Sequence, residues 1–148
     1  MTDKQFWMKM DQLSASKKLS SSMKSYQLSS LLAEAYCSDL NIIIGCREEA
    51  DGELHQTYIG INENTNAKGS RFLLIYSSPR YAKYDPMGYV SAKVFDVMNN
   101  MFHKQSIGGL CLNRFSDDPE RTMVTALKEV LETFVPGEKP FPPNYSEN

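Results

Sequence analysis

Cysteine and histidine are scarce in this chain, which has three cysteines and two histidines. Cys37, Cys46 and Cys111 are odd in number, lie far apart and form no CxxC pair, so neither a disulfide framework nor a zinc ribbon is indicated. A reducing cytoplasm is the simplest location for such a chain. Because only His55 and His103 offer an imidazole, a nucleophile activated by a neutral-pH base has few positions open to it.

Long apolar runs and a surplus of one charge are also missing. The longest apolar runs, such as Phe72 to Tyr76, are far shorter than the roughly 20 residues that cross a bilayer. No apolar segment with a small-residue cleavage site follows the first residues, so no secretory signal is expected. With 16 Lys plus Arg against 18 Asp plus Glu, the chain has no overall positive field that would attract nucleic acid. We therefore expect a cytoplasmic protein with no nucleic-acid or membrane partner.

The sequence motifs of several enzyme classes are absent. The chain has no G-x-S-x-G, G-x-x-x-x-G-K-[ST], H-E-x-x-H or G-x-G-x-x-G pattern, so hydrolase, phosphate-loop, zinc-helix and dinucleotide interpretations lack support. The carboxylates of Glu48, Glu49, Asp51 and Glu53 do not follow EF-hand or zinc spacing, and a solvated acidic turn is the simpler interpretation. We expect no cofactor, no metal and no catalytic residue.

What the chain does contain is an ordinary globular composition, 41% hydrophobic and 23% charged, in 148 residues that suit one domain. Short apolar or alternating runs bounded by turn residues predict strands at residues 40–46, 57–61, 71–76 and 107–112. Apolar residues at helical spacing predict helices at residues 4–13, 26–36, 91–103 and about 117–135. The predicted fold class is therefore α/β in the mixed α+β sense. It has a four- to five-stranded mixed sheet with helices packed on it and an N-terminal helical arm.

The two ends of the chain differ in composition from the middle. Residues 1–24 join an amphipathic helix to a serine-rich stretch, which predicts an arm that packs either on its own domain or on a second chain. Residues 25–135 form the expected domain, and the proline-rich residues 136–148 predict an extended tail. Residues 1–28 carry five Lys against two Asp, whereas residues 29–68 carry seven acidic against two basic side chains. The arm and an acidic face could therefore attract each other.

A candidate site follows from one predicted strand, helix, strand unit. Residues 71–76, 92–103 and 107–112 have the lengths of a right-handed crossover, so the two strands should run parallel. Open α/β sheets usually bind ligands at the carboxyl ends of such strands, where the two following loops would meet. The candidate binding residues in these loops are Ser77, Ser78, Arg80, Tyr81, Asn113, Arg114 and Phe115.

The side chains in these loops suit two kinds of partner. Arg80 and Arg114 offer donors to a carboxylate or phosphate, whereas Tyr81 and Phe115 offer aromatic area of the kind found in protein interfaces. The leading hypothesis is a non-catalytic interaction or regulatory module that holds a protein partner or a second copy of itself. The alternative is an enzyme or small-ligand-binding protein that takes a small anion at this carboxyl edge. The plainer interpretation is solvated loop residues, with Asn113 tying a turn.

Two segments resemble the SseB protein N-terminal domain family, over about residues 26–134. They are Tyr76-Ser77-Ser78-Pro79 and Gly109-Leu110-Cys111-Leu112-Asn113, each after a buried strand, with Arg114 standing where the family usually has proline. The resemblance implies an α/β module without established catalytic residues. It also implies a second alternative function, a secretion-associated, chaperone-like protein.

Overall fold

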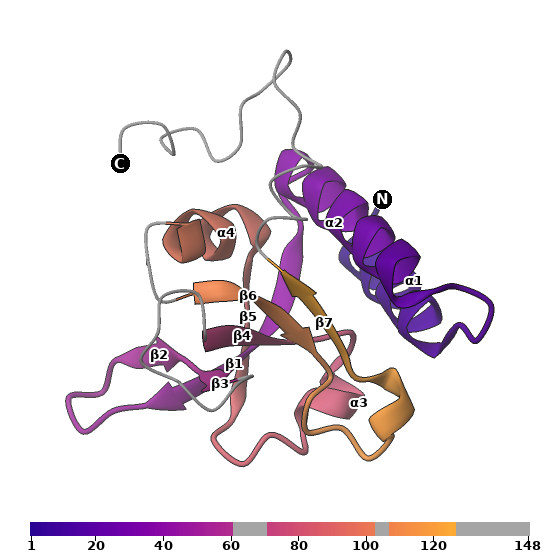
Figure 1. Ribbon diagram of the computed structural model, residues 1–148. Coiled ribbons are helices and arrows are strands. Elements are labelled where there is room, and N and C mark those ends of the chain that lie inside the picture. Colours follow the sequence, from indigo (N-terminus) through magenta and orange to yellow (C-terminus); the bar gives the residue numbers. More distant parts are fainter. Residues whose placement is uncertain (61–70, 103–106, 127–148) are drawn as a thin grey trace.

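The computed structural model describes residues 1–60, 71–102 and 107–126. Within these residues it has four α-helices and a short 3₁₀ helix: α1 (Asp3–Ala15), α2 (Ser21–Cys37), α3 (Pro79–Ala82), α4 (Val94–Phe102) and η1 (Pro119–Arg121). Its strands are β1 (Asn41–Glu48), β2 (Leu54–Gln56), β3 (Tyr58–Gly60), β4 (Arg71–Tyr76), β5 (Tyr89–Lys93), β6 (Ile107–Leu112) and β7 (Met123–Ala126). The α/β fold class is confirmed, and the mixed sheet is larger than the four to five strands expected (Figure 1).

The order of strands in the sheet is β2-β1-β4-β6-β7, with β3 also pairing with β4 and β5 with β1. β4 and β6 are parallel and adjacent, so that Leu73 lies opposite Leu110 and Ile75 opposite Leu112. The predicted parallel pair is thus confirmed. The other pairings of the sheet in the described residues are antiparallel.

Helices α1, α2 and α4 lie on one side of the sheet, and α3 lies on the other (Figure 1). The first side holds the main core, in which α1 and α2 pack on alternate strand residues such as Ile42, Ile44 and Ile75. The opposite side carries a smaller cluster in which Tyr81 and Ala82 of α3 cover other strand residues. Alternation places successive side chains of each strand on opposite faces, so both faces of the central strands are buried.

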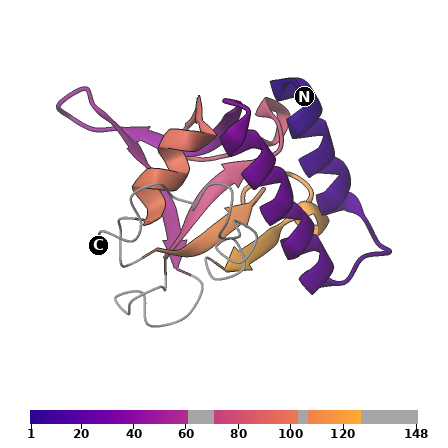
Figure 2. The ribbon, with the colours of Figure 1, turned by 90° about the horizontal axis from the view of Figure 1, so that it is seen from above.

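Residues 1–24 do not form a separate arm. Helix α1 lies beside α2 (Figure 2) and buries Phe6, Met10 and Leu13 in the main core, so it packs on its own domain. The expected boundary between residues 24 and 25 falls inside α2. Serines support this helix instead of breaking it, because Ser20 caps it by accepting from the Met23 backbone N–H at 3.2 Å.

The helix predicted at residues 91–103 is confirmed over α4, but the beginning of that segment and part of the expected last helix are strands. Ser91 lies in β5 instead of capping a helix, and Met123 begins β7 instead of continuing a helix from Asp117. Both strands are only four or five residues long, and at that length pairing with a neighbouring strand outweighs a helical spacing of apolar residues. His103, the remainder of the expected last helix and the tail at 136–148 lie outside the described residues. Among the helices that the structure describes, none combines the length and apolar character needed to cross a membrane.

Candidate functional site

The carboxyl ends of β4 and β6 meet, as predicted, and two buried polar residues join them. The backbone N–H of Ser77 donates to Oδ1 of Asn113, and Nδ2 of Asn113 donates to Oγ of Ser77, both at 3.0 Å. Both residues are fully buried. Asn113 has a φ of 58°, in the left-handed region that asparagine tolerates better than most residues. Asn113 and Ser77 therefore tie the two loops together. The bond through the Asn113 side chain agrees with the plainer interpretation, but these two residues are buried and not solvated.

Helix α1 covers this edge with a carboxylate that the sequence did not single out. Oδ1 of Asp11 accepts from Oγ of Ser77 at 3.3 Å and from the guanidinium of Arg121. Nε of Arg121 also lies 3.1 Å from Oδ2 of Asp118, and its guanidinium carbon lies 5.2 Å from the centre of the Tyr81 ring. The carboxylate of Asp11 therefore engages the donors of Ser77 and Arg121 at this edge.

The pKa values of these groups keep them in one protonation state near neutral pH, which suits a structural contact better than acid–base chemistry. Burial, with help from the Asp11 carboxylate, raises the pKa of Tyr81, so its phenol stays protonated near neutral pH. Burial acts to lower the pKa of Arg121, but Asp11, Tyr81 and Asp118 together outweigh it and the net pKa is raised. Burial also raises the pKa of Tyr76, whose hydroxyl donates to the Asp85 carboxylate at 2.6 Å.

The outer part of the edge carries exposed cations beside aromatic rings. The guanidinium of Arg80 lies 5.5 Å from the centre of the Tyr81 ring, and that of Arg114 lies 5.3 Å from the Phe115 ring. The ammonium of Lys83 lies 5.1 Å from the Tyr84 ring. Ser78, predicted as a site residue, is partly exposed between them. We call the surface formed by Arg80, Lys83, Tyr84, Arg114 and Phe115 the cation–aromatic edge.

The two buried cysteines do not supply a nucleophile. Burial raises the pKa of Cys111 to about 11, against a smaller lowering effect of Arg114, and burial also raises the pKa of Cys46. A thiol is reactive as its thiolate, so both are unreactive near neutral pH. Cys37 is exposed at the end of α2.

One group of side chains in the described residues has the composition of a metal site. The ligand atoms of Asp51, Glu53 and His55 all lie within 4.8 Å of one another, at the β1–β2 turn. The sequence spacing did not reveal this, because a tight turn brings together residues that alternate along the chain. All three are exposed, and Asp51 accepts from the Glu53 backbone N–H at 2.9 Å, an ordinary turn interaction. We assign no metal to them.

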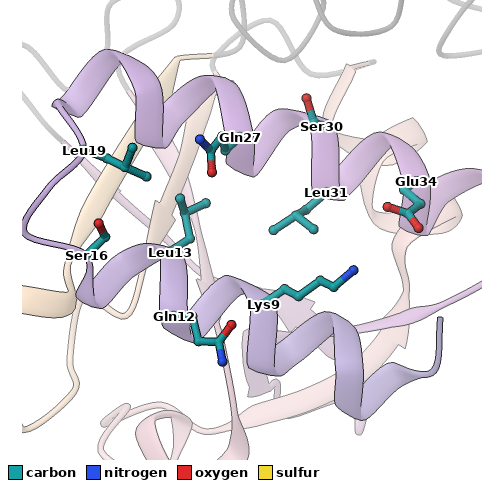
Figure 3. A pocket seen from close by; sticks show the side chains of 9 residues that line it. All are labelled: Lys9, Gln12, Leu13, Ser16, Leu19, Gln27, Ser30, Leu31 and Glu34. Carbon is teal, nitrogen blue, oxygen red and sulfur yellow. The ribbon is translucent and has the colours of Figure 1, made fainter.

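The structure also has two hollows away from the edge. A groove of about 520 Å³ runs between α1 and α2, where Leu13 and Leu31 point into the space between the helices and Lys9 and Glu34 lie along it (Figure 3). A second cavity, of about 400 Å³, lies beside the β1–β2 hairpin and is lined mainly by polar side chains. We call it the hairpin cavity.

No family model matches the chain, and neither a curated protein nor a solved structure matches it. The resemblance to the SseB protein N-terminal domain family therefore stays a prediction.

Proposed function

We propose that this protein is a non-catalytic interaction module that binds an acidic segment of a protein partner at the cation–aromatic edge. The observation that carries the proposal is the set of exposed cations, Arg80, Lys83 and Arg114, each close to an aromatic ring, in or directly after α3 and directly after Asn113. Arginine and aromatic side chains are enriched in protein interfaces and among the residues that carry most of the binding energy.

The buried polar groups beneath this surface support binding over catalysis. Ser77, Asn113, Asp11 and Arg121 are engaged with one another, so they hold the loops in place instead of facing a substrate. Loops fixed in their binding conformation lose little entropy on association, which favours affinity for a partner. The same pairing weighs against an enzyme pocket built from Ser77, Asn113 and Arg121, since these side chains already bond to one another or to Asp11.

Charge defines the kind of partner. The exposed cations lie near the exposed carboxylate of Asp117, which accepts from the Tyr84 hydroxyl at 3.4 Å, whereas the neighbouring Asp118 carboxylate is paired with Arg121. An acidic peptide segment would meet a positive rim, and the attraction would speed association and weaken with salt. The proposal includes a reducing, cytoplasmic location, which three free thiols support. The secretion-related, chaperone-like alternative has no physical observation in its favour.

The test is affinity capture from extract of the cells that express the protein, with three baits. These are the unaltered chain, Arg80→Glu with Arg114→Glu, and the control Lys9→Glu with Lys18→Glu, which makes the same charge change on exposed residues at α1 and the loop after it. We expect acidic partners to be retained by the unaltered and control baits and to fall at least about tenfold with the edge variant.

Two results would contradict this proposal. Equal recovery of the same partners by the edge variant would remove the cation–aromatic edge from binding, and loss only with the control variant would move binding to α1. Light scattering on the purified chain serves as a further check. A dimer that the edge variant abolishes would make the partner a second copy instead of an acidic protein.

A further inference from the structure

The hairpin cavity is rich in hydrogen-bond donors. It lies at the β1–β2 hairpin, and its lining includes the side chains of Arg47, His55, Gln56, Tyr58 and Arg71. Its volume of about 400 Å³ lies within the range of small-molecule sites. It is separate from the cation–aromatic edge, with which it shares no residue.

Two arginines and a histidine line this cavity. Arg47 and His55 are direct partners in the β1–β2 register, so their side chains lie next to each other on one face. The guanidinium of Arg71 lies 5.0 Å from the centre of the Tyr58 ring, and among the described residues no carboxylate pairs with it. Arg47 is engaged through Nε, 2.7 Å from Glu49, which leaves its terminal NH₂ groups as donors.

One uncharged donor adds to the set. Oε1 of Gln56 accepts from the Tyr58 hydroxyl at 2.8 Å and from Nδ2 of Asn100 at 3.1 Å, which fixes the amide and leaves its NH₂ group as a donor. Thr57 also lines the cavity, but its hydroxyl oxygen is buried beside Gly45 and has no hydrogen-bond partner among the described residues. It is therefore not counted among the donors that face a ligand.

We propose that the hairpin cavity binds a small molecule through an oxyanion group, a phosphate or a carboxylate, held by Arg47 and Arg71. A guanidinium presents two parallel N–H groups that match either oxyanion. Acidic side chains on the same hairpin, Glu48, Glu49, Asp51 and Glu53, disfavour a polyanion, so the ligand carries one such group on an otherwise neutral body. The Tyr58 ring and the half-exposed thioether of Met87 offer apolar contact for that body.

The test is a titration of the ¹⁵N-labelled full chain, followed by NMR, with inorganic phosphate, phenyl phosphate and phenylacetate. Sodium chloride at matched ionic strength is the control. We expect saturable shifts of amides in β2, β3 and the first residues of β4, with phenyl phosphate or phenylacetate at least about tenfold tighter than inorganic phosphate because of its apolar body. Comparing phenyl phosphate with phenylacetate separates a phosphate ligand from a carboxylate ligand.

Matched variants assign the effect to the two arginines. Arg47→Gln with Arg71→Gln should weaken binding by at least about tenfold, and Arg71→Lys, which keeps the charge without the fork, should weaken it less. Arg80→Gln with Arg114→Gln removes two guanidinium groups elsewhere and should leave affinity within about twofold. Each single variant, Arg47→Gln and Arg71→Gln, is titrated as well, so a folding defect in the double variant would not stop the test. Unsaturable shifts, unchanged affinity in the Arg47 and Arg71 variants, or shifts centred on the cation–aromatic edge would each overturn the proposal.

Discussion

The carboxyl edge and the hairpin cavity both contain polar side chains, but those of the carboxyl edge pair with one another and some of those in the hairpin cavity do not. At the carboxyl edge, Ser77, Asn113 and Asp11 satisfy one another inside the protein. In the hairpin cavity, the Thr57 hydroxyl has no hydrogen-bond partner and Arg71 no carboxylate partner within the described residues. Polar groups that pair internally stabilise the fold. A buried hydroxyl without a partner costs stability, whereas the exposed guanidinium of Arg71 remains available to a ligand. The inner part of the carboxyl edge, where the parallel strands predict a ligand site, is thus a structural joint, by which we mean a set of buried or half-buried polar contacts that hold two loops and α1 together.

Helix α1 is the cause of this difference. It brings Asp11 over the carboxyl edge, and Phe6, Met10 and Leu13 hold it there in the main core. Full burial of each such side chain contributes about 1.5–3 kcal/mol, so lifting α1 away would cost several kcal/mol. Asp11 therefore behaves as a permanent part of the edge, and a ligand of that edge must use its exposed outer residues.

The largest effect that would test this comparison is on cysteine reactivity beneath the two regions. Cys111 lies in β6 below the carboxyl edge, and Cys46 lies in β1 beside the hairpin cavity. With a pKa of about 11, Cys111 is about 0.1% thiolate at pH 8, so iodoacetamide should modify exposed Cys37 at least about 100-fold faster. Mass spectrometry of digested samples measures the three rates. Modification of Cys46 as fast as Cys37 would contradict its burial in β1.

The next effect is on stability, and it contrasts one residue from each region. Asn113→Ala removes both hydrogen bonds to Ser77, leaves a buried N–H without an acceptor and places alanine at a φ of 58°. We expect the free energy of unfolding to fall by about 3 kcal/mol. Arg71→Gln, on an exposed side chain, should change it by less than about 0.5 kcal/mol. Urea denaturation compares the two variants. A loss below about 1 kcal/mol for Asn113→Ala would contradict the stabilising role of the contact between Ser77 and Asn113.

The parts of the fold that were predictable are those where a residue pattern has only one good solution. The run Ile42–Ile44, residues 72–76 of β4 and strand β6 are continuously apolar, which favours central strands buried on both faces. Their length and the helix between β4 and β6 then fixed the parallel pairing and brought Ser77 to Asn113. Strands β5 and β7 were missed because four or five residues carry too little periodic signal.

The part of the site that was not predictable depends on tertiary packing. Asp11 and Arg121 are 110 positions apart, and each looks in the sequence like an ordinary solvated charge. Their pairing needs α1 to pack on its own domain, a choice that the amphipathic pattern left open. The donors of the hairpin cavity escaped notice for the same reason, because β2, β3 and β4 bring His55, Tyr58 and Arg71 together only in the folded sheet.

A smaller effect is expected at the ion pair that closes the edge. The side chains of Arg121 and Asp11 are 23% and 31% exposed, so Asp11→Ala should lower the free energy of unfolding by about 1–2 kcal/mol, less than a fully buried pair would. Lys17→Ala is the control, because its pair with Glu120 spans 3.9 Å with side chains 86% and 76% exposed. A double-mutant cycle of Asp11 and Arg121 isolates the coupling. Equal effects of Asp11→Ala and Lys17→Ala would show that the pair of Asp11 with Arg121 does not hold α1 on the carboxyl edge.

The smallest effect is the most discriminating, because it has opposite signs in the two regions. Thr57→Val keeps the shape of the side chain and removes a buried hydroxyl without a partner, so stability should stay equal or rise by up to about 1 kcal/mol. Ser77→Ala removes a hydroxyl that donates to Asp11 and accepts from Asn113, and stability should fall by about 1 kcal/mol or more. Thermal unfolding of both variants measures the two signs. If Thr57→Val destabilised the protein as Ser77→Ala does, the Thr57 hydroxyl would have a partner of its own, and the hairpin cavity would be a second structural joint.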